Sequence, residues 1–222
     1  MIHFLHIGKT GGTALKHALE KTARREVTVH PHQVKLPDIP VGEQVFFFLR
    51  DPISRFVSGF ISRQRQGRPR YSVPWNESET AAFTRFATPN ALAEALSAED
   101  PGERAAADAA MAGIGHVRDS YWAWFISPGY LRSRSGDILF IGQQEHLNED
   151  VRVLSGLLKC GRLVLPEDDV AAHRNPEKAD KSLSELAVAN LTQRLESEFD
   201  AIRLCGEIAR AKGFGGSLAQ GQ

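Results

Sequence analysis

Apolar runs and segments with helical spacing alternate over the first sixty residues. An apolar run at 2–7 leads through a short loop into a segment with helical spacing at about 13–22. β-branched residues at 26–30 predict a second strand, and the unbroken apolar run 44–49 predicts a third, covered on both faces. A proline then opens a predicted helix over 52–64. This order predicts an α/β fold with a parallel sheet.

Helical patterns dominate the rest of the chain, with one further buried strand predicted at 137–141. The spacing of Ser182 and Glu185 is that of a capping box and predicts the start of a final helical region reaching about residue 212. Other helices are predicted at about 80–86, 89–97, 102–112 and 147–158. We expect a single domain over 1–222 with a helical and loop insertion at 61–136.

Composition excludes several classes of protein. The 222 residues include 27 basic and 27 acidic side chains, so no overall charge attracts nucleic acid or a membrane surface. The two cysteines lie far apart and predict neither a disulfide framework nor a zinc site. No apolar run reaches about 18 residues, and a strand starts almost at once. We therefore expect no membrane span, no signal peptide and a cytoplasmic location.

The loop at 8–13 has the composition of an anion site. It reads Gly-Lys-Thr-Gly-Gly-Thr between the first strand and the first helix. Glycine backbones and a helix N-terminus offer N–H groups to an anion, and Lys9 adds a charge. Lys9 precedes the glycines, whereas the Walker A lysine follows them. An ordinary turn with a solvated lysine has the same composition. The candidate anion-binding residues are Lys9, Thr10, Gly11, Gly12 and Thr13.

A second motif, at 50–60, reads Arg-Asp-Pro-Ile-Ser-Arg-Phe-Val-Ser-Gly-Phe. Arg50 follows a buried strand, the position at which open parallel sheets bind ligands, and Ser58 lies about two helical turns further on. An arginine fork and a hydroxyl group suit a second phosphate. A capping ion pair between Arg50 and Asp51 is the alternative interpretation.

Together these stretches resemble the sulfotransferase superfamily that uses 3′-phosphoadenosine 5′-phosphosulfate (PAPS), most closely its carbohydrate (heparan-type) branch. The loop 8–13 is similar to the family's 5′-phosphosulfate loop, with Gly8 in place of proline, and 50–60 is similar to its 3′-phosphate motif. Residues 140–147 are similar to a family segment of the form Val-Gly-x-x-Glu-x-Leu. The resemblance implies a P-loop-like three-layer sandwich around a central parallel sheet, with 61–136 forming the acceptor side.

The resemblance also implies a reaction. A sulfuryl group would pass in line from PAPS to a hydroxyl of a carbohydrate or small-molecule acceptor, leaving 3′,5′-ADP and requiring no metal. Lys9 would stabilise the leaving phosphate, while Arg50 and Ser58 would bind the 3′-phosphate. Arg174 and Lys178 either close over the nucleotide or belong to a solvated loop. The sequence indicates neither the acceptor nor the oligomeric state.

Two histidines are candidates for the base that deprotonates the acceptor. A histidine pKa near neutrality suits this role, and His30 and His32 directly follow the second predicted strand. Several carbohydrate sulfotransferases that this chain resembles have a histidine base in this region, one branch with a His-x-His pair. We favour His32 over His30, because His30 can still belong to the strand. His3 and His6 are interpreted as core residues.

Other readings of these residues remain. An atypical ATP-dependent P-loop kinase is disfavoured by the position of Lys9 and by the lack of an obvious acidic strand end for Mg²⁺. A non-catalytic nucleotide-binding module would keep Lys9 and Arg50 without needing the histidines. The arginines of 63–70 either meet an acidic acceptor or are solvated. The aromatic residues of 120–125 either pack in the core or form a substrate platform.

Overall fold

The computed structural model describes residues 1–23, 25–168, 170, 176, 178–214 and 216–220. The chain forms two compact units. The first comprises residues 1–51, 120–173 and 198–222, and the second comprises residues 52–119 and 174–197. The expected insertion at 61–136 is therefore divided between the two units. Within the described ranges, no helix has both the length and the apolar character that crossing a membrane requires.

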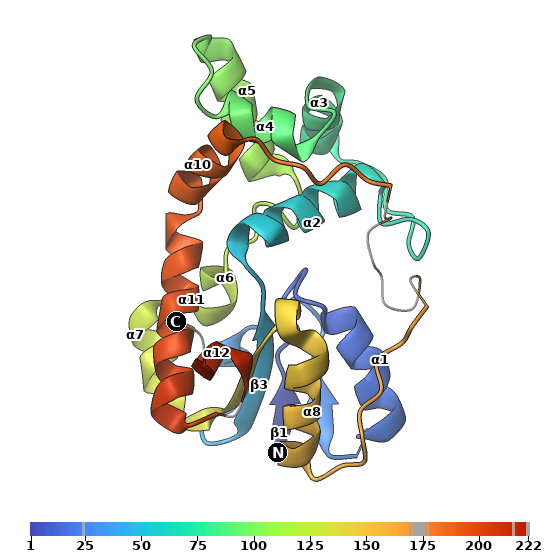
Figure 1. Ribbon diagram of the computed structural model, residues 1–222, viewed down its shortest axis with the longest axis vertical. Coiled ribbons are helices and arrows are strands. Elements are labelled where there is room, and N and C mark those ends of the chain that lie inside the picture. Colours follow the sequence, from blue (N-terminus) through green and yellow to red (C-terminus); the bar gives the residue numbers. More distant parts are fainter. Residues whose placement is uncertain (24, 169, 171–175, 177, 215, 221–222) are drawn as a thin grey trace. The chain divides into compact units, whose positions relative to one another are not determined.

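A parallel sheet of four strands, in the order β2-β1-β3-β4, is the centre of the first unit (Figure 1). This confirms the predicted α/β fold. The strands are β1 (Ile2–Phe4), β2 (Val27–Val29), β3 (Gln44–Leu49) and β4 (Ile138–Gln143). The α-helices assigned to this unit are α1 (Gly12–Thr22), α6 (Trp122–Phe125), α7 (Pro128–Ser133), α8 (Leu147–Leu158), most of α11 (Glu196–Lys212) and α12 (Ser217–Gln220). Short 3₁₀ helices are η1 (Leu36–Asp38), η2 (Ser135–Asp137) and η3 (Gln144–His146).

Helices cover both faces of this sheet, which explains why β3 is apolar without interruption. Phe46 and Phe48 belong to a core that includes side chains of α1 and α8. The alternate residues, Val45 and Phe47, belong to a core that includes side chains of α6, α7 and α11. Successive side chains of a strand point to opposite faces, so each residue of β3 is buried under one layer or the other. The arrangement is compatible with a three-layer sandwich.

The second unit is helical. Its helices are α2 (Pro52–Gln64), α3 (Glu77–Arg85), α4 (Pro89–Ala95), α5 (Pro101–Gly113) and α10 (Glu185–Arg194). Their apolar faces form one core, to which Phe60 of α2 and Phe83 of α3 contribute an edge-to-face ring pair. Helix α3 begins three residues before the expected position, because Asn76 caps it and Glu79 completes a capping box.

The predicted capping box at the last helical region is wrong. Ser184 caps α10 by accepting a hydrogen bond from the amide of Ala187, whereas the hydroxyl of Ser182 donates to Asp180. The region is also two helices, because α10 ends at Arg194 and α11 begins at Glu196. Ser184 can cap a helix N-terminus as well as Ser182 can. Ser184 is the cap because its amide donates to Asn90 and its hydroxyl donates to Glu94, which holds it at this position.

Candidate functional site

The strand order singles out one edge of the sheet in the first unit. After β1 the chain forms α1 and then β2, which pairs with one side of β1. Strand β3 pairs with the other side of β1 and also with β4. Connections therefore diverge between β1 and β3, and open parallel sheets bind ligands at the carboxyl ends of such strands. The first predicted motif begins four residues after β1, and the second directly follows β3.

The loop after β1 has a backbone suited to an anion. Lys9 and Gly11 adopt left-handed conformations, with φ of 67° and 81°. Helix α1 begins at Gly12, and no side chain in the described ranges caps it. The first N–H groups of a helix have no intrahelical acceptor and carry a partial positive charge. The loop thus presents backbone donors beside the half-buried Lys9.

Two further residues of the loop have structural roles. Thr10 is buried, and its hydroxyl donates to the carbonyl oxygen of Ile7 at 3.0 Å, so this proton fixes the loop. Gly12 lies against the ring of His6, because a Cβ at this position would be 2.1 Å from His6 Cδ2. Any side chain at Gly12 would displace that ring. Thr13 is half-buried in the first turn of α1.

Arg50, at the end of β3, reaches the loop after β1. Its Nη1 donates a long hydrogen bond of 3.5 Å to the carbonyl oxygen of Lys9. Its backbone is fixed by Tyr121, whose hydroxyl accepts from the Arg50 amide at 2.9 Å and donates to the Arg50 carbonyl at 2.7 Å. Glu145 accepts from the amide of Asp51 at 3.0 Å. These longer-range contacts fix the backbone at Arg50 and Asp51.

Sequence reasoning missed the roles of Tyr121 and Glu145. Tyr121 belongs to the aromatic stretch, and with Trp124 and Phe125 it is buried in the core, as one of the two interpretations expected. Only its hydroxyl partner shows why a tyrosine is needed. Glu145 lies in the segment 140–147, and the similarity of this segment to the sulfotransferase segment was the signal that could have indicated Glu145.

His32 pairs with His6 at this edge of the sheet. The two ring centroids are 3.9 Å apart, and His32 Nδ1 donates to the backbone carbonyl oxygen of His6 at 2.9 Å. A carbonyl oxygen can only accept, so a neutral His32 has its lone pair on Nε2, as a general base requires. Burial lowers the pKa of His6 to about 3, with smaller contributions from His32 and Lys16.

His30 belongs to a different pair. Its Nε2 lies 2.8 Å from Nδ1 of His3, and the two rings stack. His3 Nε2 is in turn hydrogen-bonded to the carboxylate of Glu43. Burial lowers the pKa of His30, the neighbouring His3 lowers it further, and Asp38 opposes both effects. His3 and His6 are both buried, as expected.

Two of the remaining predicted residues belong to the second unit. Ser58 is buried on α2 of the second unit, and Lys178 is exposed in a turn of that unit. Arg174 lies outside the described residues. The structure thus brings Lys9 and Arg50 together, and it describes Ser58 and Lys178 within the second unit.

The arginine-rich segment is partly structural. Arg63 forms a buried two-point ion pair with Glu79, at 2.6 and 2.5 Å, and also donates to the carbonyl of Pro74. Burial acts to raise the pKa of Glu79, but hydrogen bonds from Arg63 and two backbone amides outweigh it and lower that pKa. Arg68 and Arg70 are exposed.

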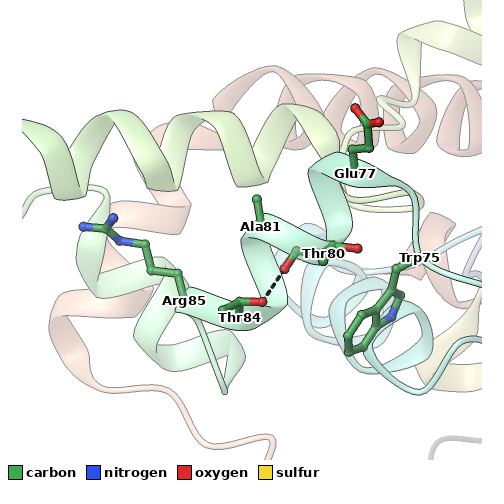
Figure 2. Close-up of a pocket in the computed structure, with 6 residues that line it drawn as sticks. All are labelled: Trp75, Glu77, Thr80, Ala81, Thr84 and Arg85. Carbon is green, nitrogen blue, oxygen red and sulfur yellow. Dashed lines mark hydrogen bonds between the residues drawn. The ribbon is translucent and has the colours of Figure 1, made fainter.

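A surface pocket of about 780 Å³ lies on one side of α3 (Figure 2). Two of its polar side chains have partners, since Thr84 donates to the carbonyl of Thr80 and Arg85 pairs with Glu103. The residues that line it are Trp75, Glu77, Thr80, Ala81, Thr84 and Arg85. None of them belongs to the predicted site.

In the part of the chain that the structure describes, no group of three or more histidine, cysteine or acidic side chains is placed to hold a metal ion. Comparison of the chain with protein-family models, with characterised proteins and with solved structures gives no match.

Proposed function

We propose that this protein is a PAPS-dependent sulfotransferase that transfers a sulfuryl group to a hydroxyl of a carbohydrate or small-molecule acceptor. The observation that carries the proposal is the meeting of Arg50 with the Lys9 loop where the connections of β1 and β3 diverge. Two cations and a helix N-terminus that no described side chain caps lie at one sheet edge, and together they suit a ligand with more than one anionic group.

Different residues of the chain suit the different anionic groups of PAPS. The N–H groups at the start of α1 and the Lys9 ammonium suit the 5′-phosphosulfate, and the guanidinium of Arg50 suits the 3′-phosphate. Ser58 remains a proposed second contact to the 3′-phosphate. PAPS would supply the sulfuryl group, and transfer through a loose transition state mainly requires positioning and charge stabilisation.

A base is still required for the acceptor hydroxyl. His32 and His30 both follow β2, next to β1 in the sheet. Each forms a hydrogen bond through one ring nitrogen that orients the ring, and imidazole is the side chain best suited to act as a base near neutral pH. Removal of both histidines should therefore abolish turnover without abolishing nucleotide binding.

Calorimetric titration with 3′,5′-ADP, 5′-AMP and ATP in the absence of metal tests the binding part of the proposal. We expect a preference for 3′,5′-ADP that falls roughly tenfold or more in Arg50→Ala, the size of a lost charged hydrogen bond. Ser58→Ala should also reduce it. The matched controls are Arg152→Ala, an exposed arginine of α8, and Ser62→Ala, one turn beyond Ser58 on α2.

The other outcomes separate the competing functions. Equal affinity for the three nucleotides, or a preference for ATP that depends on Mg²⁺, would refute the proposal, and the second result would favour a kinase. Preference for 3′,5′-ADP without transfer of radioactive sulfate from labelled PAPS to a panel of sugars, phenols and alcohols would favour a non-catalytic module. Transfer that disappears in the His30→Ala/His32→Ala double variant would support the enzyme.

A further inference from the structure

Three polar side chains form a hydrogen-bonded chain across neighbouring strands of the sheet. Glu43 immediately precedes β3, His3 lies in the middle of β1, and His30 immediately follows β2. The carboxylate of Glu43 is hydrogen-bonded to Nε2 of His3, and Nδ1 of His3 is hydrogen-bonded to Nε2 of His30 at 2.8 Å. His3 is 5% exposed, so its hydrogen bonds are shielded from solvent. These three residues are called the Glu43 chain below.

The hydrogen-bond partners in the Glu43 chain determine which ring nitrogen of each histidine carries the proton. The hydrogen bond from His3 lowers the pKa of Glu43, so its carboxylate is ionised at neutral pH and can only accept. His3 must then carry its proton on Nε2, and a neutral His3 has its lone pair on Nδ1. His30 must in turn donate from Nε2. The remaining nitrogen, Nδ1 of His30, carries the lone pair of that ring.

We infer that Glu43 and His3 are positioning residues that hold His30 as the Nε2–H tautomer and stabilise its protonated form. The inference rests on the proposed sulfotransferase function, in which His30 is one of the two candidate bases. A hydrogen bond to a carboxylate strengthens the next bond in a chain by polarising the group between them. Glu43 therefore favours a positive charge on His30 through His3. His32 differs, since its Nδ1 donates to the uncharged carbonyl of His6.

In the proposed reaction, the acceptor oxygen forms a bond to sulfur while its proton moves to Nδ1 of His30. The bond from sulfur to the bridging oxygen breaks, and its electron pair stays on the 5′-phosphate of the departing 3′,5′-ADP. His30 becomes an imidazolium whose Nε2–H still points to His3, and Glu43 remains a carboxylate. The proton leaves to solvent after product release, because His30 is only half-buried.

Other charges bear on the Glu43 chain. Burial and the neighbouring His3 lower the pKa of His30, whereas Asp38 of η1 acts to raise it, in the same direction as the effect inferred for Glu43. The amino group of Met1 contributes to lowering the pKa of Glu43. A test must therefore change the charge of Glu43 while leaving Asp38 and the amino terminus intact.

The test is nitrogen-15 NMR of the full chain with labelled histidine, using long-range proton–nitrogen correlations that distinguish the two tautomers. At pH 8 we expect His3 and His30 both as Nε2–H tautomers. Glu43→Ala should give mixed tautomers at both rings. Glu43→Gln keeps an acceptor oxygen but removes the charge, so it should keep the tautomers and shift the titration of His30 to lower pH. A purely structural role of Glu43 would leave that titration unchanged.

Glu26→Ala is the matched control, because Glu26 precedes β2 at the sheet level at which Glu43 precedes β3. It should change neither tautomers nor titration. An Nδ1–H tautomer of His3 in the wild type, or an unshifted His30 titration in Glu43→Gln, would overturn the inference. These readouts need no turnover. If the NMR results appear as expected but 3′,5′-ADP does not bind, the proposed function is wrong and the positioning role of Glu43 and His3 is supported. If 3′,5′-ADP binds but the NMR results do not appear, only the positioning role is rejected.

Discussion

The hydroxyl group of Tyr121 bonds both polar backbone groups of Arg50, donating to its carbonyl at 2.7 Å and accepting from its amide at 2.9 Å. Tyr121 is fully buried, so Tyr121→Phe removes both bonds where water cannot easily replace them. We expect a loss of about 1–3 kcal/mol in the free energy of unfolding and weaker binding of 3′,5′-ADP. Urea unfolding and calorimetry measure the two effects.

Tyr71→Phe is the control for Tyr121→Phe. Tyr71 is half-exposed, and its hydroxyl accepts a hydrogen bond from the neighbouring Arg70. The change should stay within about 0.5 kcal/mol and leave binding intact. Equal effects of the two substitutions would contradict a specific role of Tyr121 at Arg50.

Two lysines of the first unit, Lys9 and Lys159, have a left-handed backbone conformation, with φ of 67° and 50°. Replacing either with glycine relieves about 1–2 kcal/mol of backbone strain and adds about 0.5–1 kcal/mol of unfolded-state entropy. Both variants should therefore unfold within about 1 kcal/mol of the wild type. Only Lys9→Gly should reduce the affinity for 3′,5′-ADP, by roughly tenfold or more. Similar affinities for the two variants would show that Lys9 does not bind the ligand.

His6 should make the stability depend on pH. Its pKa is about 3 in the fold and 6.5 ordinarily, so between these values the unfolded state binds more protons than the folded state. The contribution of this neutral ring is therefore complete above about pH 6.5 and decreases as the pH falls toward 3, with a slope of about 1.4 kcal/mol per pH unit. Unfolding by urea between pH 4 and pH 7 measures it.

His6→Asn should reduce that slope, whatever its effect on absolute stability. His146→Asn is the control, because the side chain of His146 is half-exposed. The pH slope of His6→Asn is to be compared with that of this variant, which also loses one histidine. A slope in His6→Asn as steep as that of the wild type would assign the pH dependence to other groups.

The buried pair of Arg63 and Glu79 should stabilise the second unit. Their side chains are 11% and 2% exposed. Glu79→Gln leaves a buried guanidinium beside a neutral group, so we expect a loss of about 3–5 kcal/mol. The same change in the exposed pair of Arg85 and Glu103, Glu103→Gln, should cost about 0–1 kcal/mol. Urea unfolding followed by tryptophan fluorescence compares them, and a small loss in both would remove the structural role assigned to Arg63.

The hydrophobic pattern predicted some elements to the residue. Strand β3 and helices α2 and α8 begin and end where the sequence indicates. These elements have long apolar runs or stripes, so burial and local geometry favour the same bounds. The start of α10 was misplaced because Ser182 and Ser184 both have the local chemistry of a cap, and only contacts with Asn90 and Glu94 distinguish them.

The sequence by itself determined the α/β class, the place of Lys9 in the loop after β1 and the place of Arg50 directly after β3, because periodicity and loop composition are local properties. It did not determine that Arg50 reaches the Lys9 loop, nor that Glu43 and His30 meet the ring of His3. These contacts join residues 27 to 41 positions apart. They follow from the strand order and from the register that places both Val27 and Gln44 beside Ile2. Strand pairing depends on how the whole sheet packs under its helices, and only the tertiary structure decides it.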